Sequence, residues 1–297
     1  MEIVKPQAIS NDQITVNVSE TEASEYAASV TYGLGAEVIR DHKIYVSTIA
    51  GNVGNDPLLQ DQTLTSVLWL FKAFTNAFAF RDGVLSHKTE KSGTLEINFY
   101  DLDNFDAVVL FGLVGSQVIV RGYAADGSQL LWKKIILSGR IVAGWRDWLT
   151  KGFNSYSNKV VVKDMPAGVS RLRITLSGSQ TAIGEVVLGD LVDVGKTQVS
   201  GTSGQSIPMS TVDWNQYGTL TLVKRPTRTE MTYRVFVSTD KFEAIKPVLD
   251  DLQGEIVAVI GSEARASTVN LGVLGAIKWS EGMHDGVFFQ VTLRGVI

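Results

Sequence analysis

Side chains that could act as acids, bases or metal ligands are few in this sequence and lie far apart along it. The histidines are His42, His87 and His284, each beside charged residues or glycine. Asp101, Asp103 and Asp106 form an acidic group that could serve a hydrolase or a metal, but Asp and Asn also favour turns between strands. A metal site or an acid–base pair needs several converging groups. We therefore predict lone surface histidines, a turn at 101–106, no metal, no cofactor and no catalytic residue.

A second candidate is the aromatic segment Trp145-Arg146-Asp147-Trp148. Trp and Arg are frequent anchors of protein contacts, so Trp145, Arg146 and Trp148 are predicted to form an interaction patch. The alternative is a loop that folds over one end of a β-sandwich with Trp148 in its core. The sequence alone leaves both interpretations open.

Composition restricts the class of protein. The 297 residues are 44% hydrophobic and 20% charged, which is typical of a chain with two or three folded domains. Net charge is -4, from 27 basic and 31 acidic residues, so we expect no nucleic-acid partner. The absence of cysteine excludes disulfides and thiolate sites. The start of the sequence does not resemble a signal peptide, and glycines interrupt the apolar stretch Val108–Val120, so we expect no membrane insertion.

Most of the chain has the pattern of short strands separated by Gly, Asn, Asp and Ser. Arg171–Leu176 alternates apolar and polar residues, as a half-buried strand does. Ser66–Phe80 is compatible with either a short helix or a strand. These patterns predict a mainly β fold.

The best helix candidate is Thr239–Gln253. Ser238 or Thr239 can cap its start, and Gly254 can end it. Its apolar residues recur at spacings of three and four: Phe242, Ile245, Val248, Leu249 and Leu252. Pro247 in the middle is expected to kink the helix, because proline lacks a backbone donor.

Polar stretches near Gly83–Gly93 and Gly195–Ser206 suggest two boundaries, the second with the composition of a linker. The first predicted module is a small β domain at 1–90, and the second is a jelly-roll-like β-sandwich at 91–195. The third is a small α+β domain at 196–297 in which a sheet packs on the helix at 239–253. Trp214 and Trp279 are expected to cover edges of that sheet.

The N-terminal module contains an ordered series of motifs. These are a Tyr-x-x-Gly turn at Tyr32–Gly35, a strand ending in Tyr45, an Asn-x-Gly-x-x-Pro loop at Asn52–Pro57, and then Trp69. The series resembles a module common in phage tail proteins, itself similar to small chitin-binding domains of chitinases. Gly184–Thr197 and Tyr217–Arg225 resemble the end of the middle domain and the start of the last domain in the same phage family. The resemblance implies a bacteriophage tail or baseplate protein with a carbohydrate-binding-like module.

The same resemblance implies sugar-binding residues: Tyr26, Tyr32, Tyr45 and Trp69. Exposed aromatic faces would stack on the apolar side of a sugar ring. The alternative is that these side chains form the core of the module, because a small domain needs large side chains to bury enough surface. We favour the core for Tyr32, Tyr45 and Trp69, and expect Tyr26 to be the most exposed.

The sequence therefore predicts a non-enzymatic structural component of a bacteriophage virion tail, at the tail tip or baseplate. Its roles would be assembly and attachment to the host surface. The expected partners are other tail and baseplate proteins, copies of itself and host surface glycans, after synthesis in the host cytoplasm. The alternative is a carbohydrate-binding protein or an accessory module of a glycan-degrading enzyme. Release of reducing ends from chitin or peptidoglycan fragments would favour that alternative.

Overall fold

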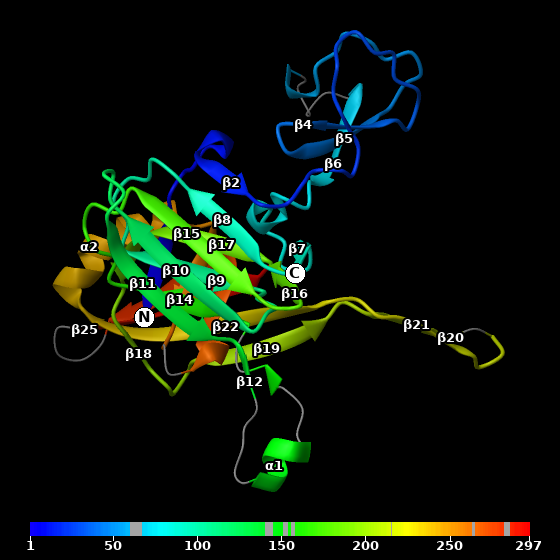
Figure 1. Cartoon of the computed structure of the whole chain (residues 1–297). Coiled ribbons are helices and arrows are strands. Elements are labelled where there is room, and N and C mark those ends of the chain that lie inside the picture. The colour runs from blue at the N-terminus through cyan, green and yellow to red at the C-terminus, as the bar shows by residue number, and fades with distance from the viewer. Residues whose placement is uncertain are drawn as a thin grey trace.

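The computed structural model describes residues 1–59, 67–139, 145–150, 154–155, 158–214, 216–262, 265–281 and 286–297. The protein is mainly β, as the sequence predicts. A body of packed sheets carries three parts that project from it: a small module, a long hairpin and a short helix (Figure 1). None of the described helices is long and apolar enough to cross a membrane.

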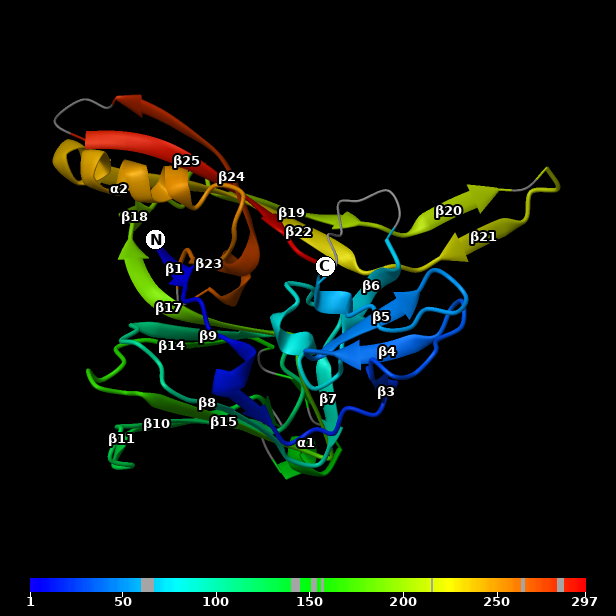
Figure 2. The ribbon, with the colours of Figure 1, turned by 90° about the horizontal axis from the view of Figure 1, so that it is seen from above.

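A large curled antiparallel sheet runs through the body (Figure 2). Its strands, in spatial order, are β14 (Val160–Val162), β9 (Ala107–Phe111), β17 (Glu185–Asp193), β1 (Glu2–Pro6), β23 (Ile256–Ile260), β24 (Val269–Glu281), β25 (Gly286–Gly295), β22 (Thr227–Ser238) and β18 (Lys196–Thr197). β19 (Ser203–Pro208) also pairs with β22.

A second sheet, here called the outer sheet, packs against the β14–β9–β17 part of the large sheet. Its strands, in order, are β11 (Gln129–Ile136), β10 (Gln117–Tyr123), β15 (Arg171–Ser177), β8 (Leu95–Phe99) and β2 (Ile14–Val16). Leu172, Ile174 and Leu176 alternate inward from β15, as the sequence pattern predicts, and meet Val108 and Leu110 of β9. The two sheets therefore form a β-sandwich.

The chain start ties the sandwich to the C-terminal part of the body. Strand β1 pairs with β17 on one side and with β23 on the other. Its side chains alternate, so Ile3 joins the core beneath the C-terminal helix, whereas Val4 joins a core shared with β9 and β23. The sequence predicted a first module at 1–90. In the structure, β1 and β2 instead lie in sheets that are built mainly from later residues.

Helix α2 (Thr239–Asp251) covers one face of the C-terminal part of the large sheet (Figure 2). Its buried residues Phe242, Ile245 and Leu249 pack on Tyr233 and Val235 of β22. The helix starts after Ser238, whose side chain makes no capping hydrogen bond, and it continues through Pro247. Gly254 follows its end with φ of 86°, a conformation that glycine adopts without strain.

The small module lies apart from the body at one end (Figure 1). Its strands are β3 (Ser24–Glu25), β4 (Glu37–Arg40), β5 (Lys43–Ser47) and β6 (Trp69–Phe74). β3 and β4 are parallel, and the other pairs are antiparallel. The ambiguous segment Ser66–Phe80 thus contains a strand. Residues 60–66 lie outside the described part of the chain.

The remaining strands form short pairs. These are β7 (Thr89–Ser92) with β16 (Gln180–Ile183), β12 (Ser138–Gly139) with β13 (Asn154–Ser155), and β20 (Thr211–Trp214) with β21 (Leu220–Val223). Helix α1 (Trp145–Thr150) lies between β12 and β13 in the sequence. Single 3₁₀ turns occupy Asn11–Gln13, Pro57–Leu59, Ala79–Arg81 and Ala266–Thr268. The expected linker Gly195–Ser206 contributes β18 and part of β19, so much of it is strand.

Candidate functional site

The aromatic residues predicted to bind sugar form the core of the small module. Tyr32, Tyr45 and Trp69 are buried, Trp69 completely, and they pack around Val38. The rings of Tyr32 and Trp69 meet edge to face with centroids 5.2 Å apart, and Trp69 Nε1 donates a hydrogen bond to the Asn55 carbonyl at 2.8 Å. Their faces are therefore turned to one another and are not open to a sugar ring.

Tyr26 is the least buried of the four, as the sequence analysis expects. Its ring stacks on Tyr32 at 5.9 Å, meets the edge of Trp69 at 6.0 Å, and carries the Arg40 guanidinium 5.8 Å from its centroid. Its hydroxyl is buried and has no hydrogen-bond partner among the described residues. Burial raises the pKa of Tyr26. Because neighbours occupy its ring, Tyr26 offers little open surface for stacking.

An ion pair fixes the loop Asn52–Pro57. Arg40 reaches both carboxylate oxygens of Asp56, at 3.3 and 2.8 Å. Burial alone would raise the pKa of Asp56, but hydrogen bonds from Arg40 and from the Leu58 amide together lower it. Asn52 is buried and donates to Ser47 Oγ at 3.2 Å. The Asn-x-Gly-x-x-Pro loop is thus a structural support for the module.

The predicted patch around Trp145 lies on helix α1, and a loop over one end of the sandwich was the alternative interpretation. Trp145 is 79% exposed, and Arg146 is exposed as well. Leu149, one turn after Trp145, is also exposed and lies on the same side of the helix. The side chain of Trp148 lies outside the described residues, as do the segments on either side of α1.

The histidines are not lone groups where the structure describes them. His42 stacks on Phe78 at 3.7 Å, and its Nδ1 lies 2.8 Å from Glu20 Oε1. His87 Nδ1 lies 2.5 Å from Asp82 Oδ2. The prediction of lone surface histidines is therefore wrong for these two, because each is half-buried beside a carboxylate. His284 lies outside the described residues.

The acidic group at 101–106 lies in the turn that the sequence predicts. Asp101 has a φ of 49°, and Asp106 accepts a hydrogen bond from the Leu191 amide at 3.1 Å. Within the part of the chain that the structure describes, no three His, Cys, Asp or Glu side chains are grouped to hold a metal ion.

Sequence reasoning missed a buried carboxyl at the base of the small module. Glu185 of β17 is almost completely buried and accepts a hydrogen bond from the Gly83 amide at 2.9 Å. The pKa of Glu185 is raised to about 8, mainly by burial, while the hydrogen bond from Gly83 opposes the rise. In the sequence, Glu185 begins a run of apolar residues, and nothing there indicates that Gly83 lies beside it.

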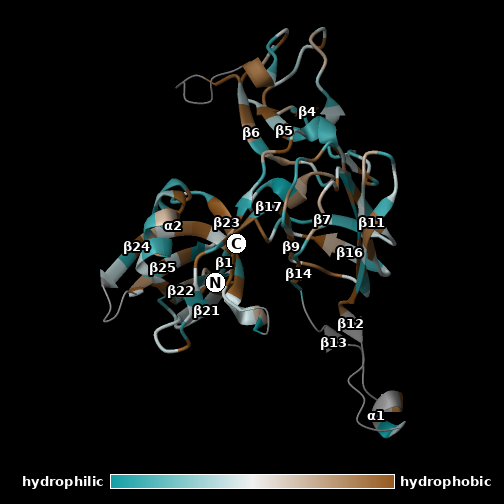
Figure 3. Ribbon diagram, turned by 90° about the vertical axis from the view of Figure 1, so that its left-hand side faces the viewer, coloured by the Kyte–Doolittle hydropathy of each residue, from teal (hydrophilic) through white to brown (hydrophobic). Residues whose placement is uncertain are grey.

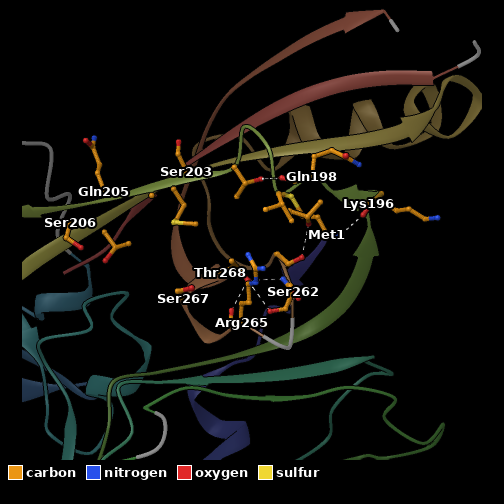
Figure 4. A pocket seen from close by; sticks show the side chains of 18 residues that line it. Met1, Lys196, Gln198, Ser203, Gln205, Ser206, Ser262, Arg265, Ser267 and Thr268 are labelled. Carbon is orange, nitrogen blue, oxygen red and sulfur yellow. Dashed lines mark hydrogen bonds between the residues drawn. The ribbon is translucent and has the colours of Figure 1, made fainter. Parts of the chain in front are cut away.

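A cavity of about 820 Å³ opens between the β18–β19 turn and the loop before β24 (Figure 4). Its walls carry mainly hydroxyl and amide groups. Several of them bond within the wall: Thr268 Oγ1 accepts from the Ser262 amide at 2.9 Å, and Thr197 Oγ1 donates to the Gly261 carbonyl at 2.7 Å. These bonds hold the cavity's loops in place and provide no acid–base pair.

The hairpin β20–β21 has apolar side chains that no described residue covers. It extends the β19–β22 ribbon away from the body (Figure 1). Val212 pairs with Leu222, and Trp214 pairs with Leu220. Residues two apart on paired strands share a face, so these four side chains form one apolar face, here called the hairpin face. They are 52%, 59%, 69% and 47% exposed, in the order Val212, Leu222, Trp214 and Leu220.

The opposite side of the hairpin is more polar. Thr211, Asp213 and Thr221 lie there together with Val223. Every described residue from 211 to 227 is exposed, so the hairpin has no core of its own. The sequence predicted that Trp214 and Trp279 cover edges of the C-terminal sheet. This is wrong for Trp214, which lies on the hairpin and is 69% exposed, and Trp279 is 54% exposed. Alternating apolar and polar residues in Leu220–Val223 indicate a strand. The alternation cannot show that the body leaves this strand uncovered.

No protein-family model and no curated protein sequence matches this chain. A search of solved structures finds a mutant of chitosan-binding module 1, derived from the chitosanase/glucanase of Paenibacillus sp. IK-5. The two chains are 10% identical, the match covers 39% of this chain and 84% of that one, and the TM-score is 0.26. A likeness at this TM-score carries no argument about function.

Proposed function

We propose that this chain is a non-enzymatic structural component of a bacteriophage tail, at the tail tip or baseplate. There it assembles with copies of itself and with other tail proteins. The family resemblance of its ordered motifs supports the setting in a tail. The observation that carries the proposed role is the uncovered hairpin face, formed by Val212, Trp214, Leu220 and Leu222.

An apolar face left in water is unfavourable to the isolated chain. Single exposed apolar residues are ordinary, but a contiguous apolar face usually marks an interaction site. A two-stranded ribbon without a covering layer is also marginally stable alone. Burying the hairpin face against a neighbouring subunit would remove both penalties. The ribbon edges can in addition pair with a strand of that neighbour.

Self-association is the first test, measured by light scattering during size-exclusion chromatography over a range of protein concentrations. The wild-type chain is expected to form oligomers, and the double variant Trp214→Ser, Leu222→Ser is expected to elute as a monomer. The matched control, Thr211→Ala with Thr221→Ala, changes the opposite side of the same hairpin and should keep the oligomer. A wild-type chain that is monomeric throughout and does not bind purified tails would contradict the proposed role.

The proposed location in a phage tail needs a separate test. Peptide mass spectrometry of purified phage particles that carry this gene should detect the chain in the tail fraction. Particles that infect normally and lack the chain would exclude a structural role in the virion.

Attachment to the host surface is the second part of the proposal. It requires a surface that recognises surface glycans. The small module's aromatic residues do not supply one, because Tyr32, Tyr45 and Trp69 are buried.

A further inference from the structure

The outward side of the outer sheet carries aromatic and cationic side chains in rows. In strands β10, β15 and β8, alternate residues are apolar and point into the core of the sandwich. The intervening residues therefore face away from it. The outward residues of these strands and of the paired β11 include the cations Arg121, Lys134, Arg171 and Arg173, the aromatic residues Tyr123 and Trp132, and also Glu96, Asn98, Ile119 and Thr175. We call this side the basic aromatic face.

No described element covers this face. In Figure 2 the outer sheet forms the lower boundary of the molecule, and Figure 3 places β11 at the opposite end of the body from α2. Trp132 is 54% exposed, which is unusual for a tryptophan on a regular strand. The face is thus open to a large ligand.

Strand register sets the spacing of the groups. Trp132 of β11 lies opposite Arg121 of β10, which lies opposite Arg173 of β15. Neighbouring strands are about 4.8 Å apart, so this row spans about 10 Å. Tyr123 and Arg171 form the next row. The sheet therefore fixes the separations of the Cα atoms that carry the aromatic ring and the guanidinium groups.

Arg171 lies among aromatic rings. Its guanidinium carbon is 4.8 Å from the ring centroid of Tyr100 and 5.6 Å from that of Tyr123. Its Nε is buried and has no hydrogen-bond partner among the described residues. The rings hold the cation in place while no carboxylate of the described chain neutralises it.

Charge on the face is positive although the whole chain carries -4. Arg121, Arg171, Arg173 and Lys134 contribute the cations. Glu96 is 3.2 Å from Arg173 Nε and offsets that one charge. An anionic ligand would therefore meet a local excess of positive charge.

We propose that the basic aromatic face binds acidic polysaccharide, with Trp132 stacking on a sugar ring and Arg121 and Arg171 pairing with its carboxylate or phosphate groups. Aromatic rings stack on the apolar side of sugars, and guanidinium groups pair with planar anions in a fixed geometry. A single-stranded nucleic acid is the competing anionic ligand, because its bases can also stack on an aromatic ring, and the experiment below distinguishes the two. The inference rests on the proposed attachment role for its biological setting and does not depend on self-association.

The test is affinity electrophoresis of the full chain in gels that contain polygalacturonate, with neutral dextran as the uncharged comparison. Polygalacturonate should retard the wild-type chain, dextran should not, and added salt should weaken the retardation. Trp132→Ala and Arg121→Gln are each expected to lower the affinity at least about tenfold, the scale of one lost anchor contact. Trp279→Ala and Arg265→Gln, which remove the same residue types elsewhere on the surface, should leave it unchanged.

Several outcomes would overturn the inference. These are equal retardation by dextran, variants that bind as wild type does, no binding at all, or tighter binding to a thymidine oligonucleotide than to polygalacturonate. Circular dichroism and the melting temperature of each variant show whether it is folded, so that lost binding is not mistaken for lost structure. Because a monomeric hairpin variant can be used in the same gels, failure here is distinguishable from failure of the assembly proposal.

Discussion

The small module and the hairpin β20–β21 both project from the body, but they use their aromatic residues in opposite ways. In the module, Tyr32 and Trp69 are buried against each other and against Val38. In the hairpin, Trp214 is mostly exposed beside Leu220. The module therefore has a core that keeps it folded, whereas the hairpin has an apolar face and no core.

The two projections also differ in how they join the body. The module's base is held by buried polar groups: Arg81 donates to Asn11 Oδ1 at 2.8 Å and to the Ile9 carbonyl at 2.5 Å, and Gly83 donates to Glu185. The hairpin is a direct continuation of β19 and β22. A tryptophan in the sequence thus indicates an important position in both regions, but only its surroundings show whether it stabilises a core or an interface.

The largest expected effect tests the core side of this comparison. Trp69→Ala should destabilise the small module by about 3–5 kcal/mol, the usual cost of removing a buried aromatic side chain. Trp214→Ala should change the stability of the monomer by less than about 0.5 kcal/mol, because its ring is exposed. Hydrogen exchange of the full chain should show lost protection in β4–β6 for the first variant only. Equal loss in both variants would remove the distinction between the two regions.

Sequence alone predicted the module's side of this contrast and not the hairpin's. The need of a small domain for large core residues favoured burial of Tyr32, Tyr45 and Trp69, and Tyr26 is the least buried of the four. Trp214, in contrast, was expected to cover a sheet edge. Alternation likewise predicted β15, and apolar spacing predicted α2 to within two residues of its end. These signals are local in the chain, and local patterns determine such elements.

The missed features depend on contacts between distant residues. Strand β1 lies between β17 and β23, which no pattern in Glu2–Pro6 could indicate. The basic aromatic face joins Trp132, Arg121 and Arg173 from three strands, and only their register brings these residues into one row. The uncovered state of the hairpin is also a property of the whole fold, because it depends on where the other sheets end.

A smaller effect concerns the base of the module and depends on pH. Burial raises the pKa of Glu185 to about 8, well above its ordinary value of 4.5. The pKa of Glu185 is higher in the folded chain than in the unfolded chain, so its contribution to folding stability is fully present below pH 4.5. That contribution is lost as the pH rises through the folded-state pKa of about 8. The wild-type chain should therefore lose on the order of 2–3 kcal/mol between pH 6 and pH 9.

Glu185→Gln should flatten this profile, because an amide can still accept the Gly83 hydrogen bond but cannot ionise. The exposed Glu90→Gln serves as the matched control and should retain the wild-type dependence. Urea unfolding at several pH values measures the profile, and hydrogen exchange at pH 9 should show opening at residues 74–83 without opening of the β19–β22 pairing. If exchange at pH 9 increased equally at residues 74–83 and in the β19–β22 pairing, ionisation of Glu185 would not act on the base of the module alone.

The smallest effect lies inside the module and separates two stacked tyrosines. Tyr32 Oη accepts a hydrogen bond from the Ala27 amide at 2.8 Å, whereas Tyr26 Oη is buried without a partner among the described residues. Tyr32→Phe should therefore cost about 1 kcal/mol, while Tyr26→Phe should be neutral or stabilising, since it removes an unsatisfied buried group. Exchange protection of β4 and β5 amides in the full chain measures both. A loss of stability in Tyr32→Phe without a loss in Tyr26→Phe would agree with a packed aromatic core. Equal losses of stability in both variants would mean that the Tyr26 hydroxyl has a hydrogen-bond partner in solution. Its ring would then be more open than the stacking on Tyr32 indicates.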